Sequence, residues 1–408
     1  MDAASARAPG AGSCLRSILL LLVRVDAPPE ERHLLLLNVH HVAFDGASTA
    51  ILLAELGALY AALAEEGGGG GSAAGAGLAE LAGQYVDYAL WQRDESLRPL
   101  LEGSREYWRS HLLDGALPVL ELPLDSPRPA AQTFRGATAA VALSAEVGAR
   151  LTGVCRQHGC TLFQLVLGVW SLLMCRHAGQ DEVVVGSPYH GRDAAGTEAL
   201  IGYFVNVLAL RVEALRAGTV SSLVACARDA ASGGMWHALL PFQLIVHELL
   251  PRRAHDASRN AVFQAMMAWG AEADERVRRS AGGTDSSSGL GGGLALRPAE
   301  IGAAHRVAKV EVTLFADVTP GDGIAGGIEF NTDLFARGGV ARLAARLFTP
   351  LAAAVDEFSA MALPPLAAAG AVEAGPPHHH SADLGCIARY FCWHGVRSQP
   401  SFGHKSTC

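Results

Sequence analysis

Apolar runs broken by turn-forming residues define the elements expected in the first 65 positions. Residues 18–23 and 34–38 are apolar, and the turn-like stretch Asp26-Ala27-Pro28-Pro29 lies between them. Two short apolar runs on either side of such a turn predict paired, buried strands, and neither run is long enough to cross a membrane. Leucines then recur at helical spacing between Thr49 and Glu65, which predicts a helix with one apolar face.

The remaining pattern alternates helices with strands. A helix with an aromatic face is expected over residues 78–113. The stretch 120–129 is expected to be extended, because proline disfavours helix at the residue before it. Further strands are predicted at 136–143, 183–186, 205–212 and 325–330, and further helices at 145–158, 161–177 (with Thr161 as N-cap) and 340–358. Strands that alternate with helices imply a layered α/β fold.

These elements divide the chain into four expected parts. Residues 1–119 are predicted to form an N-terminal lobe, 120–136 a crossover, 137–363 a C-terminal lobe and 364–408 a disordered tail. The glycine-rich stretches 67–77 and 271–293 predict a mobile loop and an exposed insertion, respectively.

The tail permits a second interpretation, as a metal site. It contains His378, His379, His380, Cys386, Cys392, His394, His404 and Cys408. Their spacing matches none of the paired-ligand patterns of zinc sites, which favours the disordered tail. The chain has no Cys-x-x-Cys pair, and Cys155, Cys160 and Cys175 are expected to be reduced, buried thiols.

Composition narrows the function classes. With 408 residues, half of them hydrophobic and 18% charged, the chain is compatible with a globular fold of two lobes. A formal net charge of −8 and the lack of a dense Lys/Arg run argue against a nucleic-acid surface. The apolar run at 18–23 is short, Arg24 follows it at once, and no cleavage site closes it, so we expect a cytosolic protein without a secretory signal.

The candidate chemistry lies directly after the second predicted strand, in the segment His40-His41-Val42-Ala43-Phe44-Asp45-Gly46. Neighbouring side chains of a strand face opposite ways, so only one of the two histidines can address a given substrate atom. A neutral imidazole at a strand end can accept a proton from an attacking amine or hydroxyl. Asp45 is placed to fix the loop by hydrogen bonds or an ion pair, and Gly46 lets the chain turn into the helix. The simpler alternative is two ordinary strand histidines beside a turn aspartate.

Six segments, in this order, resemble the condensation domains of non-ribosomal peptide synthetases. They are residues 38–49 with His-His-x-x-x-Asp-Gly, 85–91 with Tyr-x-Asp-Tyr-Ala-x-Trp, 120–136, 201–206 with Ile-Gly-x-Phe-Val-Asn, His237 with Pro241-Phe242, and 256–260 with Asp-x-Ser-Arg-Asn. Each is weak alone, but the ordered set over most of residues 15–358 is specific. For most of the four aromatic residues Tyr85, Tyr88, Trp91 and Phe204 we expect plain core packing.

The resemblance implies a two-lobed fold like that of chloramphenicol acetyltransferase, with a tunnel between the lobes. It implies an acyltransferase that joins an acyl or peptidyl thioester to an aminoacyl acceptor, both tethered to phosphopantetheine arms of carrier proteins, with neighbouring synthetase modules as partners. No cofactor or metal of its own is implied. His41 would accept or orient the amine hydrogen, His40 and Asp45 would shape the loop, and Gly46 would offer a backbone donor to the oxyanion.

The departures from the family pattern leave alternatives open. The motif after His237 reads Ala238-Leu239 in place of Gln-Asp, Val207 replaces a Thr, and Ala261 replaces a Pro. The family's first two motifs have no counterpart, so we expect an incomplete first lobe. An inactive or truncated docking domain is therefore one alternative, and an epimerase or a hydroxyl-acylating acyltransferase is another.

Overall fold

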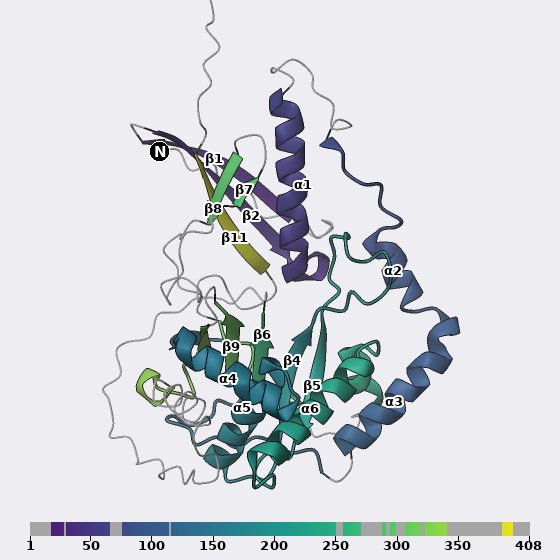
Figure 1. Ribbon diagram of the computed structural model, residues 1–408, viewed down its shortest axis with the longest axis vertical. Helices are drawn as coiled ribbons and strands as arrows, with labels where there is room; N and C mark the ends of the chain where they lie inside the picture. Colours follow the sequence, from purple (N-terminus) through teal and green to yellow (C-terminus); the bar gives the residue numbers. More distant parts are fainter. Residues whose placement is uncertain are drawn as a thin grey trace, which may run out of the picture.

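The strands form two separate sheets, which lie one above the other in Figure 1. The computed structural model describes residues 18–27, 30–65, 76–113, 116–249, 256–270, 288–290, 294–298, 307–319, 323–340 and 386–394. Within these residues a first sheet has five strands and a second sheet has six. Helices accompany both sheets, as the predicted α/β fold requires.

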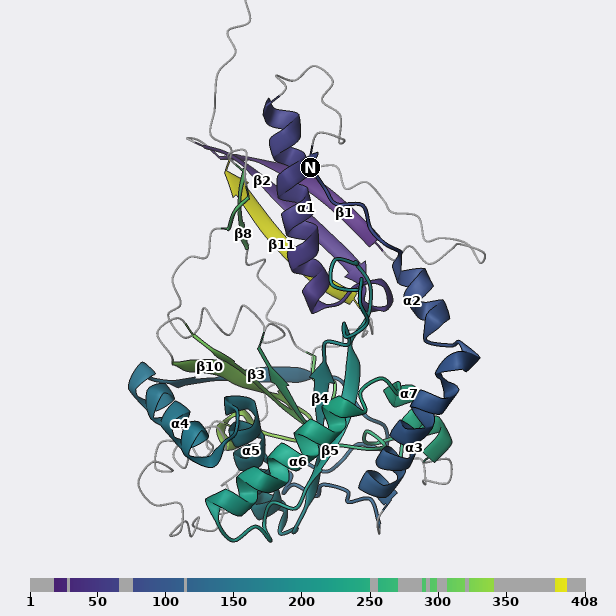
Figure 2. The same cartoon turned by 45° about the vertical axis from the view of Figure 1, so that its right-hand side comes forward.

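The first sheet contains, in spatial order, β1 (Ile18–Ala27), β2 (Glu30–His40), β11 (Cys386–His394), β8 (Leu294–Pro298) and β7 (Ser288–Leu290). β1 and β2 run antiparallel, with Ile18 opposite Val39, which confirms the predicted pairing. The helix α1 (Gly46–Glu65) runs alongside this sheet in both ribbon views (Figures 1 and 2). Leu52 of α1 packs with Leu37 and Val39 of β2, so the helix and the sheet share a small core.

The burial predicted for β1 is wrong. β1 lies at the edge of the first sheet, and its leucines are largely exposed, Leu20 by 62% and Leu22 by 60%. The apolar pattern correctly indicated a strand. It could not indicate whether another element covers that strand, because burial depends on tertiary neighbours.

The second sheet has the spatial order β3 (Gly136–Leu143), β10 (Ile324–Asn331), β9 (Val312–Val318), β6 (Ala265–Trp269), β4 (Val183–Tyr189) and β5 (Asn206–Val212). β6 runs parallel to β4 and β9, and the other pairs are antiparallel. The four strands predicted beyond residue 130 are all present, whereas β6 and β9 were not predicted. The main core of the protein lies around this sheet.

Helices α4 (Ala145–His158), α5 (Leu162–Ala178) and α6 (Val220–Trp236) pack with the second sheet, as both ribbon views show. Thr161 caps α5 as predicted: its side chain accepts from Gln164 N, and the Gln164 side chain accepts from Thr161 N. Cys155 and Cys175 are buried free thiols, as expected, and burial raises the pKa of each to about 12. Cys160, also free, is only half-buried.

Residues 78–113 do not form the single helix that the pattern predicted. They contain α2 (Tyr85–Trp91), the short 3-10 turn η3 (Glu95–Leu97) and α3 (Arg98–Leu113), and residues 78–84 are not helical. Asp94 explains the break, because its carboxylate accepts from Ser96 N and begins a new turn. Side-chain caps of this kind compete with the helical backbone bonds. After α6 the chain forms α7 (Phe242–Leu244) and the π-helical turn η4 (Ile245–Leu249).

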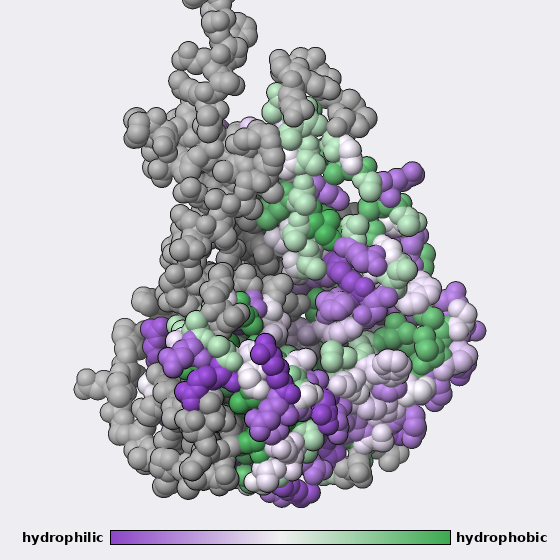
Figure 3. All heavy atoms as spheres, in the orientation of Figure 1, coloured by the Kyte–Doolittle hydropathy of each residue, from purple (hydrophilic) through white to green (hydrophobic). Residues whose placement is uncertain are grey.

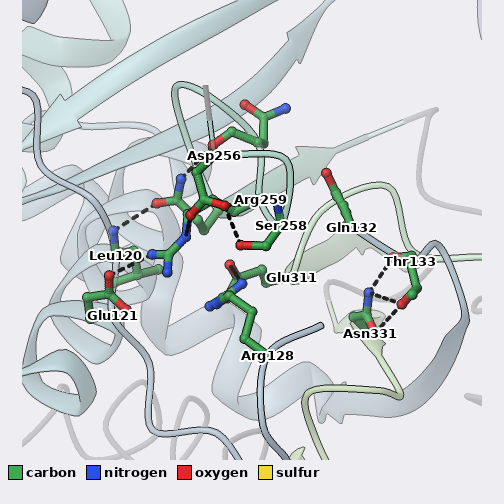
Figure 4. A network of polar contacts seen from close by, with 12 residues as sticks. Leu120, Glu121, Arg128, Gln132, Thr133, Asp256, Ser258, Arg259, Glu311 and Asn331 are labelled. Carbon is green, nitrogen blue, oxygen red and sulfur yellow. Dashed lines mark hydrogen bonds and ion pairs between the residues drawn. The ribbon is translucent and has the colours of Figure 1, made fainter. Parts of the chain in front are cut away.

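The extended stretch 120–136 is held against the second sheet by a polar network (Figure 4). Arg128 forms a bidentate pair with the buried Glu311, at 2.7 and 3.2 Å. Burial raises the pKa of Glu311, and the Arg128 guanidinium opposes this rise. Arg259 pairs with Glu121 at 2.6 Å and with Asp256 at 2.9 Å. The Asp-x-Ser-Arg-Asn segment thus holds Glu121 of this extended stretch through Arg259.

Several predicted segments lie largely or wholly outside the described residues: the loop 67–77, most of the insertion 271–293, the helix 340–358 beyond its first residue, and most of the tail. One short segment of the tail is described, in contrast to the rest of it. The structure places Cys386–His394 as β11 between β2 and β8, where a disordered tail had been expected.

One of the described helices has the length and the apolar composition of a membrane span. The stretch Gly46–Ala64 of α1 is long and apolar enough to cross a membrane, by length and composition only. In the structure this helix begins directly after the candidate site and packs on β2, β7 and β8, so its apolar character also serves to cover a sheet.

Candidate functional site

The candidate site is built where β2 ends and α1 begins. His40 is the last residue of β2, and His41–Ala43 form a short 3-10 turn, η1. The Nδ1 atom of His40 accepts a hydrogen bond from Val42 N at 3.1 Å, so this imidazole caps the turn. His41 lies in this turn and not in the strand, so the strand alternation expected for the two histidines does not apply to the pair.

The imidazole of His41 is held by the backbone of its own loop. Its Nδ1 lies 2.7 Å from the carbonyl oxygen of Phe44. A carbonyl can only accept, so this contact assigns the hydrogen to Nδ1 and leaves the lone pair on Nε2. Burial lowers the pKa of His41, which keeps the ring neutral near neutral pH. A half-buried neutral imidazole with an available Nε2 is suited to accept a proton.

Asp45 is fully buried and accepts four hydrogen bonds. Its Oδ1 accepts from Ser48 N at 2.9 Å, from Ser48 Oγ at 2.7 Å and from Arg192 Nη2 at 2.8 Å. Its Oδ2 accepts from Phe204 N at 3.1 Å. The Ser48 contacts cap the first turn of α1, while the other two reach 147 and 159 residues along the chain. Asp45 therefore joins the loop His40–Gly46 to the loop between β4 and β5.

Arg192 holds the other side of this junction. Its Nη1 donates to the carbonyl oxygens of Thr197 and Leu200, at 2.8 and 2.7 Å. Its guanidinium also lies 4.2 Å from the centre of the Phe204 ring, a cation–π geometry. Only 8% of the Arg192 side chain is exposed, so its charge is balanced chiefly by Asp45.

The Ile-Gly-x-Phe-Val-Asn segment is clamped at consecutive residues. Ser48 Oγ accepts from Gly202 N at 3.1 Å and lies 3.0 Å from Gly202 O. The Tyr85 hydroxyl donates to Tyr203 O at 2.9 Å, and a Cβ on Gly202 would lie 2.3 Å from the Tyr85 ring. Only glycine fits this close approach. The clamp brings the Tyr203 ring to 5.0 Å from the His41 ring, at an interplanar angle of 88°.

The same segment also contacts one further motif segment, the one that contains His237. Asn206 Nδ2 donates to Ala238 O at 2.7 Å and to Leu240 O at 2.9 Å, and Asn206 Oδ1 accepts from Phe242 N at 2.9 Å. The Asn of one segment thus binds the backbone of the His237 segment. This accounts for both segments without assigning them chemistry.

The structure brings His40, His41, Asp45 and Gly46 together in one loop, as their sequence positions require. Sequence reasoning missed three side chains of the site: Ser48, Arg192 and Tyr203. Ser48 stands three residues after Asp45, a capping spacing that was available as a signal. Arg192 and Tyr203 lie about 150 residues away, and spacing alone could not assign them.

No group of three or more His, Cys, Asp or Glu side chains suited to a metal ion occurs among the residues that the structure describes. The tail histidines and cysteines that allowed a metal interpretation fall outside those residues, except that the backbone of Cys386–His394 is described.

Comparison with known proteins identifies the family. The model of the family "Condensation domain" matches residues 15–361. The chain belongs to the condensation domain family. It is 34% identical over 308 residues to malpinin synthetase of Mortierella alpina, and 33% identical over 318 residues to surfactin synthase subunit 1 of Bacillus subtilis (strain 168). These matches cover 76% and 77% of this chain but only 4% and 8% of those relatives.

Solved structures support the fold. The X-domain in a complex with OxyB from teicoplanin biosynthesis has a TM-score of 0.67 and 25% identity, over 84% of this chain and 70% of that chain. The first condensation domain of the calcium-dependent antibiotic synthetase has a TM-score of 0.57 and 20% identity, over 83% of this chain and 68% of that one. The predicted fold, like that of chloramphenicol acetyltransferase, is confirmed for this condensation domain.

Proposed function

We propose that this condensation domain forms an amide bond between two carrier-bound substrates. The donor is an acyl or peptidyl thioester, and the acceptor is an aminoacyl thioester with a free amine. The observation that carries the proposal is the hydrogen bond from His41 Nδ1 to Phe44 O, which leaves Nε2 of a neutral imidazole available to an incoming amine.

The atoms balance in a direct transfer. The amine nitrogen attacks the thioester carbonyl carbon, and the carbonyl electron pair moves to oxygen. His41 Nε2 takes the proton released from the nitrogen. As the tetrahedral intermediate collapses, the carbon–sulfur bond breaks, and the departing sulfur takes this proton from His41 Nε2, which gives a free phosphopantetheine thiol and restores the neutral imidazole. Gly46 N–H, at the start of α1, is our candidate donor to the oxyanion.

Both substrates arrive tethered, so positioning supplies a large part of the rate in this proposal. Two phosphopantetheine arms would enter the interlobe tunnel from opposite ends, one from each carrier protein. Neighbouring synthetase modules are the partners that the family context supports. No cofactor of the domain itself takes part in this scheme. His40 and Asp45 act by shaping the loop, which their contacts with Val42 N and Arg192 support.

The test is a single-turnover assay with the whole chain and both carrier-bound substrates. Replacement of His41 by Ala should lower amide formation by about 10²- to 10⁴-fold, the usual effect of removing a general base. The control is His158→Ala, since His158 lies at the C-terminus of α4, a helix that packs with the second sheet. A loss below about tenfold at His41 would assign the rate to positioning alone.

A docking role without catalysis is the competing proposal. It requires that the folded wild-type chain bind a loaded carrier protein and yet form no amide with any acceptor supplied. A cooperative melting transition together with a wild-type turnover that depends on His41 would exclude it.

A further inference from the structure

The ring of Tyr203 contacts the imidazole of the proposed base, and no chemical role yet explains this side chain. Its backbone is fixed on both sides, because Gly202 is bound by Ser48 and Phe204 N donates to Asp45. Its own carbonyl oxygen accepts from the Tyr85 hydroxyl. A side chain on so firmly held a backbone has little freedom to move away from its neighbour.

That neighbour is the imidazole of His41. The two ring centroids are 5.0 Å apart and the ring planes are nearly perpendicular, at 88°. This is a preferred geometry for aromatic pairs, because the positive edge of one ring meets the negative face of the other. The hydrogen bond from Nδ1 to Phe44 O fixes one point of the imidazole but leaves rotation about that bond possible.

We propose that Tyr203 is a positioning residue for His41: its ring fixes the plane of the imidazole and covers one side of it, so that Nε2 points toward the amine. This inference rests on the proposed function for its effect on turnover. Its effect on the imidazole itself does not depend on that function.

The cover provided by Tyr203 has a consequence for acid–base behaviour. Burial is the main cause that lowers the pKa of His41, Lys309 lowers it further, and Asp45 raises it. Removing the Tyr203 ring admits water while leaving Lys309 and Asp45 in place, so the pKa of His41 should rise toward its ordinary value. A base works in its neutral form, so the acid limb of the rate profile should move to higher pH.

Three substitutions in the chain distinguish an effect of the Tyr203 ring on His41 from an effect of its hydroxyl and from the loss of another aromatic ring. Tyr203→Leu removes the aromatic ring, and Tyr203→Phe keeps the ring but removes the hydroxyl. Tyr88→Leu is the matched control, because the Tyr88 ring packs on Phe204, at 4.8 Å between centroids, and has no ring contact with His41 among the described residues. Each variant is checked first for an unchanged melting transition.

The measurements are the His41 imidazole pKa by NMR, assigned with His41→Ala, and the kcat–pH profile for amide formation. Tyr203→Leu should raise the pKa and lower kcat by about twofold to tenfold, the ratio that the strength of an aromatic pair implies. KM should change little, and Tyr203→Phe and Tyr88→Leu should match the wild type in both measurements.

An equal loss in Tyr203→Phe would overturn the proposal, because the hydroxyl rather than the ring would then be responsible. An unchanged His41 pKa in Tyr203→Leu would overturn it as well. If the wild type forms no amide while Tyr203→Leu still raises the His41 pKa, the proposed function fails and the contact between the two rings stands.

Discussion

The two sheets of this condensation domain differ in how completely they are buried. In the second sheet every residue of β10 is buried, and consecutive residues face opposite sides, so this strand is covered on both faces. In the first sheet the edge strand β1 exposes Leu20, Leu21 and Leu22 by 48 to 62%. Figure 3 shows apolar side chains gathered on the outer face of the upper part, over α1.

This difference in burial indicates that most of the stability comes from the second sheet, whereas the proposed base follows a strand of the first sheet. The large core surrounds the second sheet, whereas the first sheet shares with α1 a core of Leu37, Val39 and Phe44. The proposed base sits at the end of β2, in the less buried part. Its position is secured by the buried pair of Asp45 and Arg192, which joins the two parts. The proposed base thus follows a strand of the first sheet, and an arginine from a loop of the second sheet holds its loop in place.

The largest expected effect is a contrast between two identical substitutions. Leu210 in β5 is fully buried and Leu20 in β1 is 62% exposed. Leu210→Ala should lower the free energy of unfolding by about 3 to 5 kcal/mol, because it leaves a cavity in a packed core. Leu20→Ala should change it by no more than about 0.5 kcal/mol. Urea unfolding followed by circular dichroism measures both. Equal losses would mean that another chain covers β1 in solution.

The next largest effect tests the ion pair of Asp45 and Arg192, which joins the loop after β2 to the loop between β4 and β5. Asp45→Asn should cost about 3 kcal/mol, because it leaves the buried Arg192 charge without its partner. Melting temperature and activity should fall together. Asp94→Asn is the matched control, since the exposed Asp94 carboxylate caps only the short turn η3 and its loss should lower the melting temperature far less.

A double-mutant cycle sharpens this test. If the ion pair joins the parts, Asp45→Asn combined with Arg192→Leu should cost clearly less than the sum of the two single substitutions. A stable Asp45→Asn protein without activity would instead make Asp45 a direct participant in the reaction.

Local elements were predictable from the sequence where short-range chemistry decides them. β3 and α4 begin and end at the predicted residues, and Thr161 caps α5, because apolar period and capping side chains are local signals. The exposure of β1 and the break at Asp94 were not predicted, since the first depends on neighbouring elements and the second on a competing side-chain cap.

Only the contiguous part of the candidate site could be predicted from the sequence. The loop His40–Gly46 is contiguous, so its members could be named together. Arg192 and Tyr203 reach it from the β4–β5 loop, and only the folded chain brings them within contact distance. The sequence 386–394 is rich in aromatic residues, but nothing local indicated that it would pair with a strand more than 340 residues earlier.

The smallest effect on global stability, and the most local one, concerns β11. It lies between β2 and β8 and pairs with β2 from His40, opposite Cys386, to Arg32, opposite His394. A chain ending at residue 385 should lose this strand while the second sheet stays intact. Its global unfolding free energy should change by about 0.5 kcal/mol or less, because the main core is untouched.

Amide hydrogen exchange locates the change. In an antiparallel ladder alternate residues of β2 direct their N–H groups to opposite neighbours, so only those facing β11 should lose protection, and those facing β1 should keep it. A chain ending at residue 394 keeps β11 and is the control, with full protection expected throughout β2. Equal protection of β2 in both chains would show that β11 does not pair there in solution. Loss of protection in β10 as well would show that the two sheets unfold as one unit, against the contrast drawn between them.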